Sequence, residues 1–140
     1  MSLKERVYSV LVVSASEKFN DALYDMLPDS TYSPVETVSD ISSAKRMIAE
    51  RAFDFVIINS PLTDDLGTRF AVDACAREGT VVLLIVRAEL HEEIYDKVAQ
   101  HGVFTLSKPL SKQAVALALS WMSSARERLR KFEKKTLSIE

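Results

Sequence analysis

Three short, mostly apolar runs constrain the fold of this chain more than any other feature. They occupy residues 7–13, 53–58 and 81–86, and each is rich in β-branched side chains. Runs that are apolar on both faces are typical of parallel strands covered by helices on both sides of a sheet. We therefore expect these three segments to be the buried strands of a parallel sheet.

Segments with helical spacing alternate with these runs, and two weaker strands fit the remaining gaps at 35–38 and 103–106. The apolar positions that recur at helical intervals are Phe19, Leu23, Met26 and Leu27; Ile41, Ala44, Met47 and Ile48; Phe70 and 72–74; Ile94 and Val98. Strands alternating with helices predict an α/β fold, a (βα)₅ doubly wound five-stranded parallel sheet with right-handed crossovers.

Polar residues suitable for helix caps stand where the expected helices begin. Ser14 and Glu17 match the S-x-x-E capping box, in which both side chains satisfy amides of the first turn. Ser39 or Asp40 is expected to cap the second helix, and Ser111 the last.

Composition excludes several classes of protein. The 140 residues suit one domain plus an appendage, and the net charge of −2 gives no overall attraction to nucleic acid or membranes. No apolar run has the length of a membrane span, so we expect a cytoplasmic protein that does not contact a membrane. No glycine-rich phosphate loop follows the first strand, and His91 and His101 have no partners at ligand spacing. We expect no metal and no cofactor.

The last helix is too long to belong entirely to such a domain. Its apolar set continues past residue 120 at heptad spacing through Met122, Ala125, Leu129 and Phe132. We therefore expect a domain over 1–120 and a coiled-coil extension over 121–140, joined in a homodimer through those four residues. Six basic residues in this region (Arg126, Arg128, Arg130, Lys131, Lys134 and Lys135) are either a solvated flank or a patch facing nucleic acid.

Ligands of doubly wound sheets bind at the carboxyl ends of the strands, so the residues that follow each strand are the candidate site. These residues are Ser14 and Ala15 after the first strand, Asn59 after the third, Arg87 after the fourth, and Lys108 with Pro109 after the fifth.

This arrangement over residues 6–120 resembles a response-regulator receiver domain, a flavodoxin-like fold of two-component signal transduction. The resemblance implies a Mg²⁺-binding acidic pair at Ser14 and Ala15, a phospho-acceptor Asp at Asn59, a hydroxyl at Arg87 and a Lys-Pro pair at Lys108-Pro109. Only the Lys-Pro pair matches, and its Pro is expected after a cis bond. An amide cannot form the acyl phosphate, and two neutral residues do not hold Mg²⁺. We expect a phosphorylation-incompetent pseudo-receiver that is not an enzyme.

Two cations at this edge leave alternatives open. Arg87 and Lys108 can hold an anion, or they can pair with Asp64 or Asp65 and close the site; of these we favour the ion pair. One alternative function is a receiver that is phosphorylated on Asp64 or Asp65. Another is a flavodoxin-like domain that binds a small anion or nucleotide.

Four segments are similar to the ANTAR-type transcription antitermination regulators: VLVVSAS at 10–16, IINSPL at 57–62, GVFTLSKP at 102–109 and ARERLRK at 125–131. In that family a receiver or pseudo-receiver is joined by a coiled coil to a small domain that binds nascent RNA. The resemblance implies that the full-length protein binds RNA through a C-terminal domain absent from this sequence.

Overall fold

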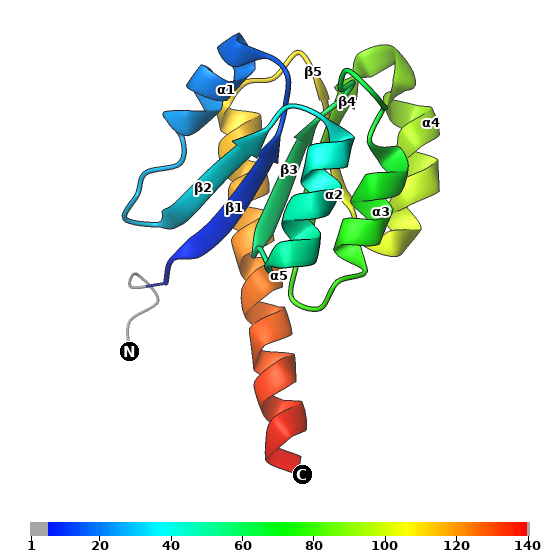
Figure 1. The fold of residues 1–140 in the computed structure, drawn as a ribbon. Coiled ribbons are helices and arrows are strands. Elements are labelled where there is room, and N and C mark those ends of the chain that lie inside the picture. The colour runs from blue at the N-terminus through cyan, green and yellow to red at the C-terminus, as the bar shows by residue number, and fades with distance from the viewer. Residues whose placement is uncertain (1–5, 140) are drawn as a thin grey trace.

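The computed structural model describes residues 6–139 and shows the predicted α/β architecture (Figure 1). In chain order the elements are β1 (Tyr8–Val13), α1 (Glu17–Tyr24), β2 (Tyr32–Val38), α2 (Ile41–Glu50), β3 (Phe55–Asn59), α3 (Thr68–Cys75), β4 (Val81–Arg87), α4 (Ala88–Val98), the 3₁₀ turn η2 (Ala99–His101), β5 (Phe104–Lys108) and α5 (Lys112–Ile139). The predicted (βα)₅ fold class is confirmed.

The five strands form one parallel sheet in the order β2-β1-β3-β4-β5. The central strand β3 is buried along its whole length, as expected for a strand that is apolar on both faces. The edge strand β2 begins at Tyr32, three residues before its predicted start. Pro34 lies within it, and a strand at the edge tolerates a residue that cannot donate to the ladder.

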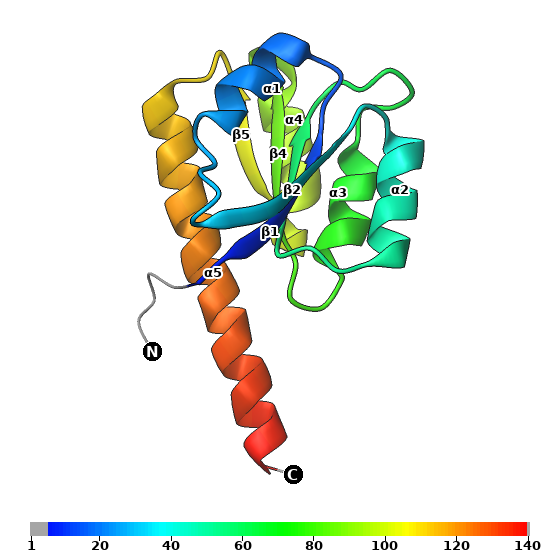
Figure 2. The same cartoon turned by 60° about the vertical axis from the view of Figure 1, so that its left-hand side comes forward.

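Helices cover both faces of the sheet, with α2, α3 and α4 on one side and α1 and α5 on the other (Figures 1 and 2). Two separate apolar clusters result. Alternate residues of a strand enter different clusters: Leu11 and Ile58 pack under α2–α4, whereas Val12 and Ile57 pack under α1 and α5. Within residues 6–139, no helix has both the length and the apolar character needed to cross a membrane.

The helix caps confirm two of the three predictions. The Asp40 carboxylate accepts from the backbone N–H of Ser43 at 2.7 Å, and the Ser111 hydroxyl accepts from Ala114 at 3.0 Å. The predicted capping role of Ser14 is wrong. Its backbone N–H still bonds to Val38 of β2, so Ser14 continues the sheet, and α1 starts two residues later than expected with Ser16 as its cap.

Helix α5 stays attached to the base of the sheet before it extends beyond the body of the domain (Figure 1). The Arg126 guanidinium lies 2.8 Å from the Asp54 carboxylate, whose other oxygen accepts from the backbone N–H of Ser9. At the next residue of α5, Glu127, the carboxylate accepts from the Tyr8 hydroxyl at 2.7 Å. These contacts hold the helix at the N-terminal ends of β1 and β3. Residues 1–5 and 140 of the two predicted regions lie outside the described chain.

We predict that Asp54→Ala lowers the free energy of unfolding by about 2 kcal/mol or more. The change removes a half-buried ion pair and the bonds to Ser9, and it leaves Arg126 without this carboxylate. Urea denaturation measures the effect. The matched control is Asp73→Ala, whose partner Arg69 is almost fully exposed and whose loss should cost about 0.5 kcal/mol or less. Equal effects of the two substitutions would contradict this role of Asp54.

Candidate functional site

Four polar side chains lie at the carboxyl ends of the parallel strands, which we call the carboxyl edge of the sheet. All four are on the same face of the sheet. Ser14, Asn59, Arg87 and Lys108 each come two residues after an apolar residue that packs under α1 and α5; those residues are Val12, Ile57, Ile85 and Leu106. Because side chains alternate along a strand, the four are directed to that same side. The structure thus brings together the residues that the sequence placed at the candidate site.

Asn59 is the buried centre of this group. Its side chain is 6% exposed, and its amide nitrogen donates to the Ser14 hydroxyl at 3.2 Å. Ser14 is buried as well and accepts a second bond from the backbone N–H of Ser16. The Asn59 amide oxygen has no hydrogen-bond partner in the described part of the chain. A buried, unpartnered polar atom costs about 1–3 kcal/mol, so this site carries unused hydrogen-bonding capacity.

Lys108 and Arg87 bring two positive charges to the same edge. They are register partners on β5 and β4, and Pro109 follows Lys108 through a cis peptide bond, as predicted. The Lys108 ammonium donates to the backbone carbonyl of Ser60, 2.8 Å away. Burial and, to a lesser degree, the charge of Arg87 lower the pKa of Lys108. The two cations therefore repel each other across neighbouring strands.

The expected ion pair between these cations and Asp64 or Asp65 does not form. Asp64 accepts from the backbone N–H groups of Ile41 and Ser42 at the start of α2, at 2.9 and 3.2 Å. The Ile41 bond is the main reason that the pKa of Asp64 is lowered. Asp65 accepts from Gly67 within its own loop. The free amides of a helix N-terminus and a tight turn thus compete successfully for both carboxylates.

The donor set at this edge does not fit a magnesium ion. Mg²⁺ is bound by carboxylate oxygens at near-octahedral geometry, whereas Ser14 and Asn59 offer only neutral oxygens and Ala15 offers a methyl group. Within the described residues, no cluster of three acidic, His or Cys side chains forms a metal site anywhere. Arg87 and Lys108 add positive charge where a cation would have to bind.

The four residues of the expected dimer seam have different surroundings. Met122 is completely buried in the cluster under α1 and α5, and Ala125 packs against that cluster, so these two belong to the domain itself. Leu129 and Phe132 are 38% and 70% exposed. Sequence reasoning missed Leu117 and Trp121, which are about half exposed on the same helix. The buried set with Met122 and the exposed set with Leu117 and Trp121 both have helical spacing in the sequence. Only the packing of α5 on the domain shows which set is buried.

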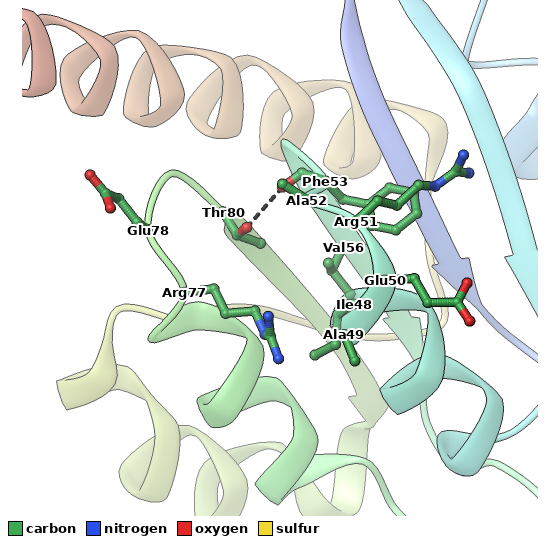
Figure 3. Close-up of a pocket in the computed structure, with 10 residues that line it drawn as sticks. All are labelled: Ile48, Ala49, Glu50, Arg51, Ala52, Phe53, Val56, Arg77, Glu78 and Thr80. Atoms are coloured by element: carbon green, nitrogen blue, oxygen red, sulfur yellow. Dashed lines mark hydrogen bonds between the residues drawn. The ribbon is translucent and has the colours of Figure 1, made fainter.

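A hollow of about 320 Å³ lies at the opposite end of the sheet, beside the C-terminal ends of α2 and α3 (Figure 3). The Thr80 hydroxyl at its wall donates to the Phe53 carbonyl at 2.8 Å. Arg51 stacks on the Phe53 ring and pairs with Glu36. These lining groups serve the packing of the domain, and the hollow is remote from Asn59.

Comparisons with known proteins identify the fold. No protein-family profile matches the sequence, and no curated protein matches it significantly. Solved structures do match. The signal receiver domain of an HD domain-containing protein from Pseudomonas fluorescens Pf-5 has a TM-score of 0.77 at 21% identity, with 94% of this chain and 96% of that chain covered.

Two further solved structures share this fold. A structure described as adenylate cyclase from Rhodopirellula baltica has a TM-score of 0.81 at 16% identity, covering 93% of this chain and 97% of that one. A two-component response regulator from Clostridium difficile has a TM-score of 0.69 at 14% identity, covering 82% and 94%. At these identities the likeness concerns the fold. The chain therefore has the fold of a response-regulator receiver domain.

Proposed function

We propose that this chain is a regulatory pseudo-receiver, which acts through binding and not through phosphotransfer or other catalysis. The observation that carries the proposal is the buried Asn59 at the end of β3, hydrogen-bonded to Ser14 at the end of β1. A carboxamide is neutral and does not form an acyl phosphate. The neighbouring oxygens do not hold the cation that phosphoryl transfer requires.

Phosphorylation of Asp64 or Asp65 is the alternative that this proposal opposes. Both oxygens of Asp64 are engaged at the N-terminus of α2, where the bonds favour the charged carboxylate and reduce its reactivity as a nucleophile. Asp65 is held by Gly67. Neither carboxylate is paired with Lys108 or Arg87 in the described part of the chain.

Incubation with acetyl phosphate and Mg²⁺ should leave the mass of the intact protein unchanged. The Asn59→Asp variant should also fail to gain a phosphoryl group, because Ser14 and Ala15 still offer no metal-binding carboxylate. Intact mass spectrometry checks both, with an unmodified receiver domain as positive control. A stable adduct of about 80 Da that disappears in Asp64→Asn or Asp65→Asn would replace this proposal with the alternative acceptor.

We propose that signal output uses a homodimer formed along α5. Leu117, Trp121 and Phe132 lie within about 60° of one another around the helix axis, and all three are at least 49% exposed. Leu129 flanks them. Figure 2 shows that one part of α5 packs on the sheet and the other extends beyond it, and the exposed apolar residues of 117–132 are spread along this continuous helix. A second copy of the same helix offers an equally long apolar stripe, and two such faces bury each other.

Leu117→Glu and Phe132→Glu should each weaken the dimer about tenfold or more, because each places a charge in the apolar stripe. Sedimentation equilibrium measures the association, and circular dichroism verifies that the fold is retained. Leu66→Glu is the matched control, since Leu66 is 47% exposed but lies in the loop before α3. A protein that is monomeric at high micromolar concentration, or a dimer that responds equally to all three changes, contradicts the proposed interface.

We also propose that the output of this regulator is RNA binding in transcription antitermination. This part of the proposal rests on the similarity of four segments to the ANTAR-type regulators. The basic residues of α5 give it limited support. Arg126 binds Asp54 and so helps to attach the helix to the domain, whereas Arg130 lies 3.4 Å from Glu127 of the same helix. Lys134 and Lys135 lie outside the side chains that the structure describes.

A further inference from the structure

The carboxyl edge of the sheet has an excess of positive charge that no described side chain neutralises. Arg87 and Lys108 are register partners on adjacent parallel strands, and the charge of Arg87 contributes to the lowered pKa of Lys108. Among the side chains of residues 6–132, which the structure describes, no carboxylate is paired with either of them. The two candidates in the loop after β3, Asp64 and Asp65, are bonded to backbone amides. Two like charges held together without a counter-charge favour the binding of an anion.

The same edge holds a buried polar side chain with an unpartnered end. Asn59 is 6% exposed, and one end of its amide bonds to Ser14 while the other has no partner in the described chain. The Ser14 hydroxyl can either accept or donate. Rotation of the amide by about 180° therefore keeps the bond to Ser14 and turns the NH₂ group toward the unpartnered position. In that orientation Asn59 offers two N–H donors to an anion.

We propose that this edge is a reversible, metal-independent binding site for a small oxyanion of the phosphate class, held by Arg87 and Lys108 and completed by the Asn59 amide. Arg guanidinium groups and Lys ammonium groups both bind phosphate oxygens through charge-assisted hydrogen bonds. Lys108 is already oriented by its 2.8 Å bond to the Ser60 carbonyl, next to Asn59 in the chain. The exposure of Arg87 and Ala15 leaves the edge open to a ligand from solvent.

This inference rests on the proposed pseudo-receiver function, because it requires that Asn59 carries no covalent phosphoryl group. It adds an input signal to that function, because the fraction of molecules with oxyanion bound depends on the concentration of the oxyanion. Binding would relieve the repulsion between the two cations and satisfy the buried amide, so the ligand should stabilise the folded chain.

The test is thermal unfolding of the full chain in increasing inorganic phosphate at constant ionic strength, with sodium chloride as the compensating salt. We expect a saturable rise in Tm with phosphate in the absence of divalent cations. Arg87→Gln should reduce the apparent affinity about tenfold or more, and it is expected to fold because Arg87 is exposed. Lys108→Gln should do the same. Arg77→Gln, an exposed arginine at the opposite end of the sheet, is the matched control and should retain binding.

Two outcomes overturn the site. One is a Tm that does not respond to phosphate beyond the chloride control, and the other is a phosphate response that all three variants retain or lose equally. A parallel titration with phenyl phosphate separates a free ion from a phosphate carried on a larger molecule: tighter binding of the ester indicates an organic phosphomonoester as the ligand. Intact mass spectrometry of the same samples tests the pseudo-receiver function separately from the oxyanion site. A covalent adduct contradicts the pseudo-receiver function, whereas an unmodified chain without phosphate stabilisation contradicts the oxyanion site alone.

Discussion

The burial of the central strands on both faces is the constraint on which the rest of the structure depends. Successive apolar residues of β1, β3 and β4 point to opposite faces of the sheet, so each face must be covered by its own layer of helices. With both faces of the sheet covered by helices, the polar groups discussed above lie at the two ends of the strands. The carboxyl edge collects Ser14, Asn59, Arg87 and Lys108, and the amino edge collects the contacts that hold α5.

At the carboxyl edge, the chain has the fold of a receiver but side chains whose charge is opposite to that of a Mg²⁺-binding site. A receiver that holds Mg²⁺ needs negative oxygens there, whereas this chain has a neutral amide, a neutral hydroxyl and two cations. Positive charge thus stands where a magnesium site needs negative oxygens, and this difference is the basis of the oxyanion site proposed above.

Helix α5 has two different faces along its length. Its inner face completes the domain through Met122, and the polar contacts of Arg126 and Glu127 fix its direction as it leaves the sheet. Its outer face carries Leu117, Trp121 and Phe132 to solvent. Because the helix is continuous, these contacts also fix the orientation of the exposed stripe relative to the sheet.

The sequence by itself determined the fold class, the five strands and the identity of the residues at the carboxyl edge, because local apolar periodicity and the position of polar residues after strands need no knowledge of distant contacts. It also identified Ser111 as a cap and limited the cap of the second helix to Ser39 or Asp40, because a cap bonds to an amide only three residues away. The start of β2 was missed because edge pairing, and not hydrophobicity, defines it.

Only the tertiary structure decided which partners each polar group has. Asp64 binds α2 instead of Lys108 because the first turn of α2 brings unpaired N–H groups next to it, a proximity that no local pattern encodes. The burial of Met122 was decided in the same way. Two apolar stripes of α5 have equivalent spacing in the sequence, and the one that enters the core is selected by the position of the sheet and of α1. Contacts between residues far apart in the chain depend on how the layers pack, and that packing is a property of the whole fold.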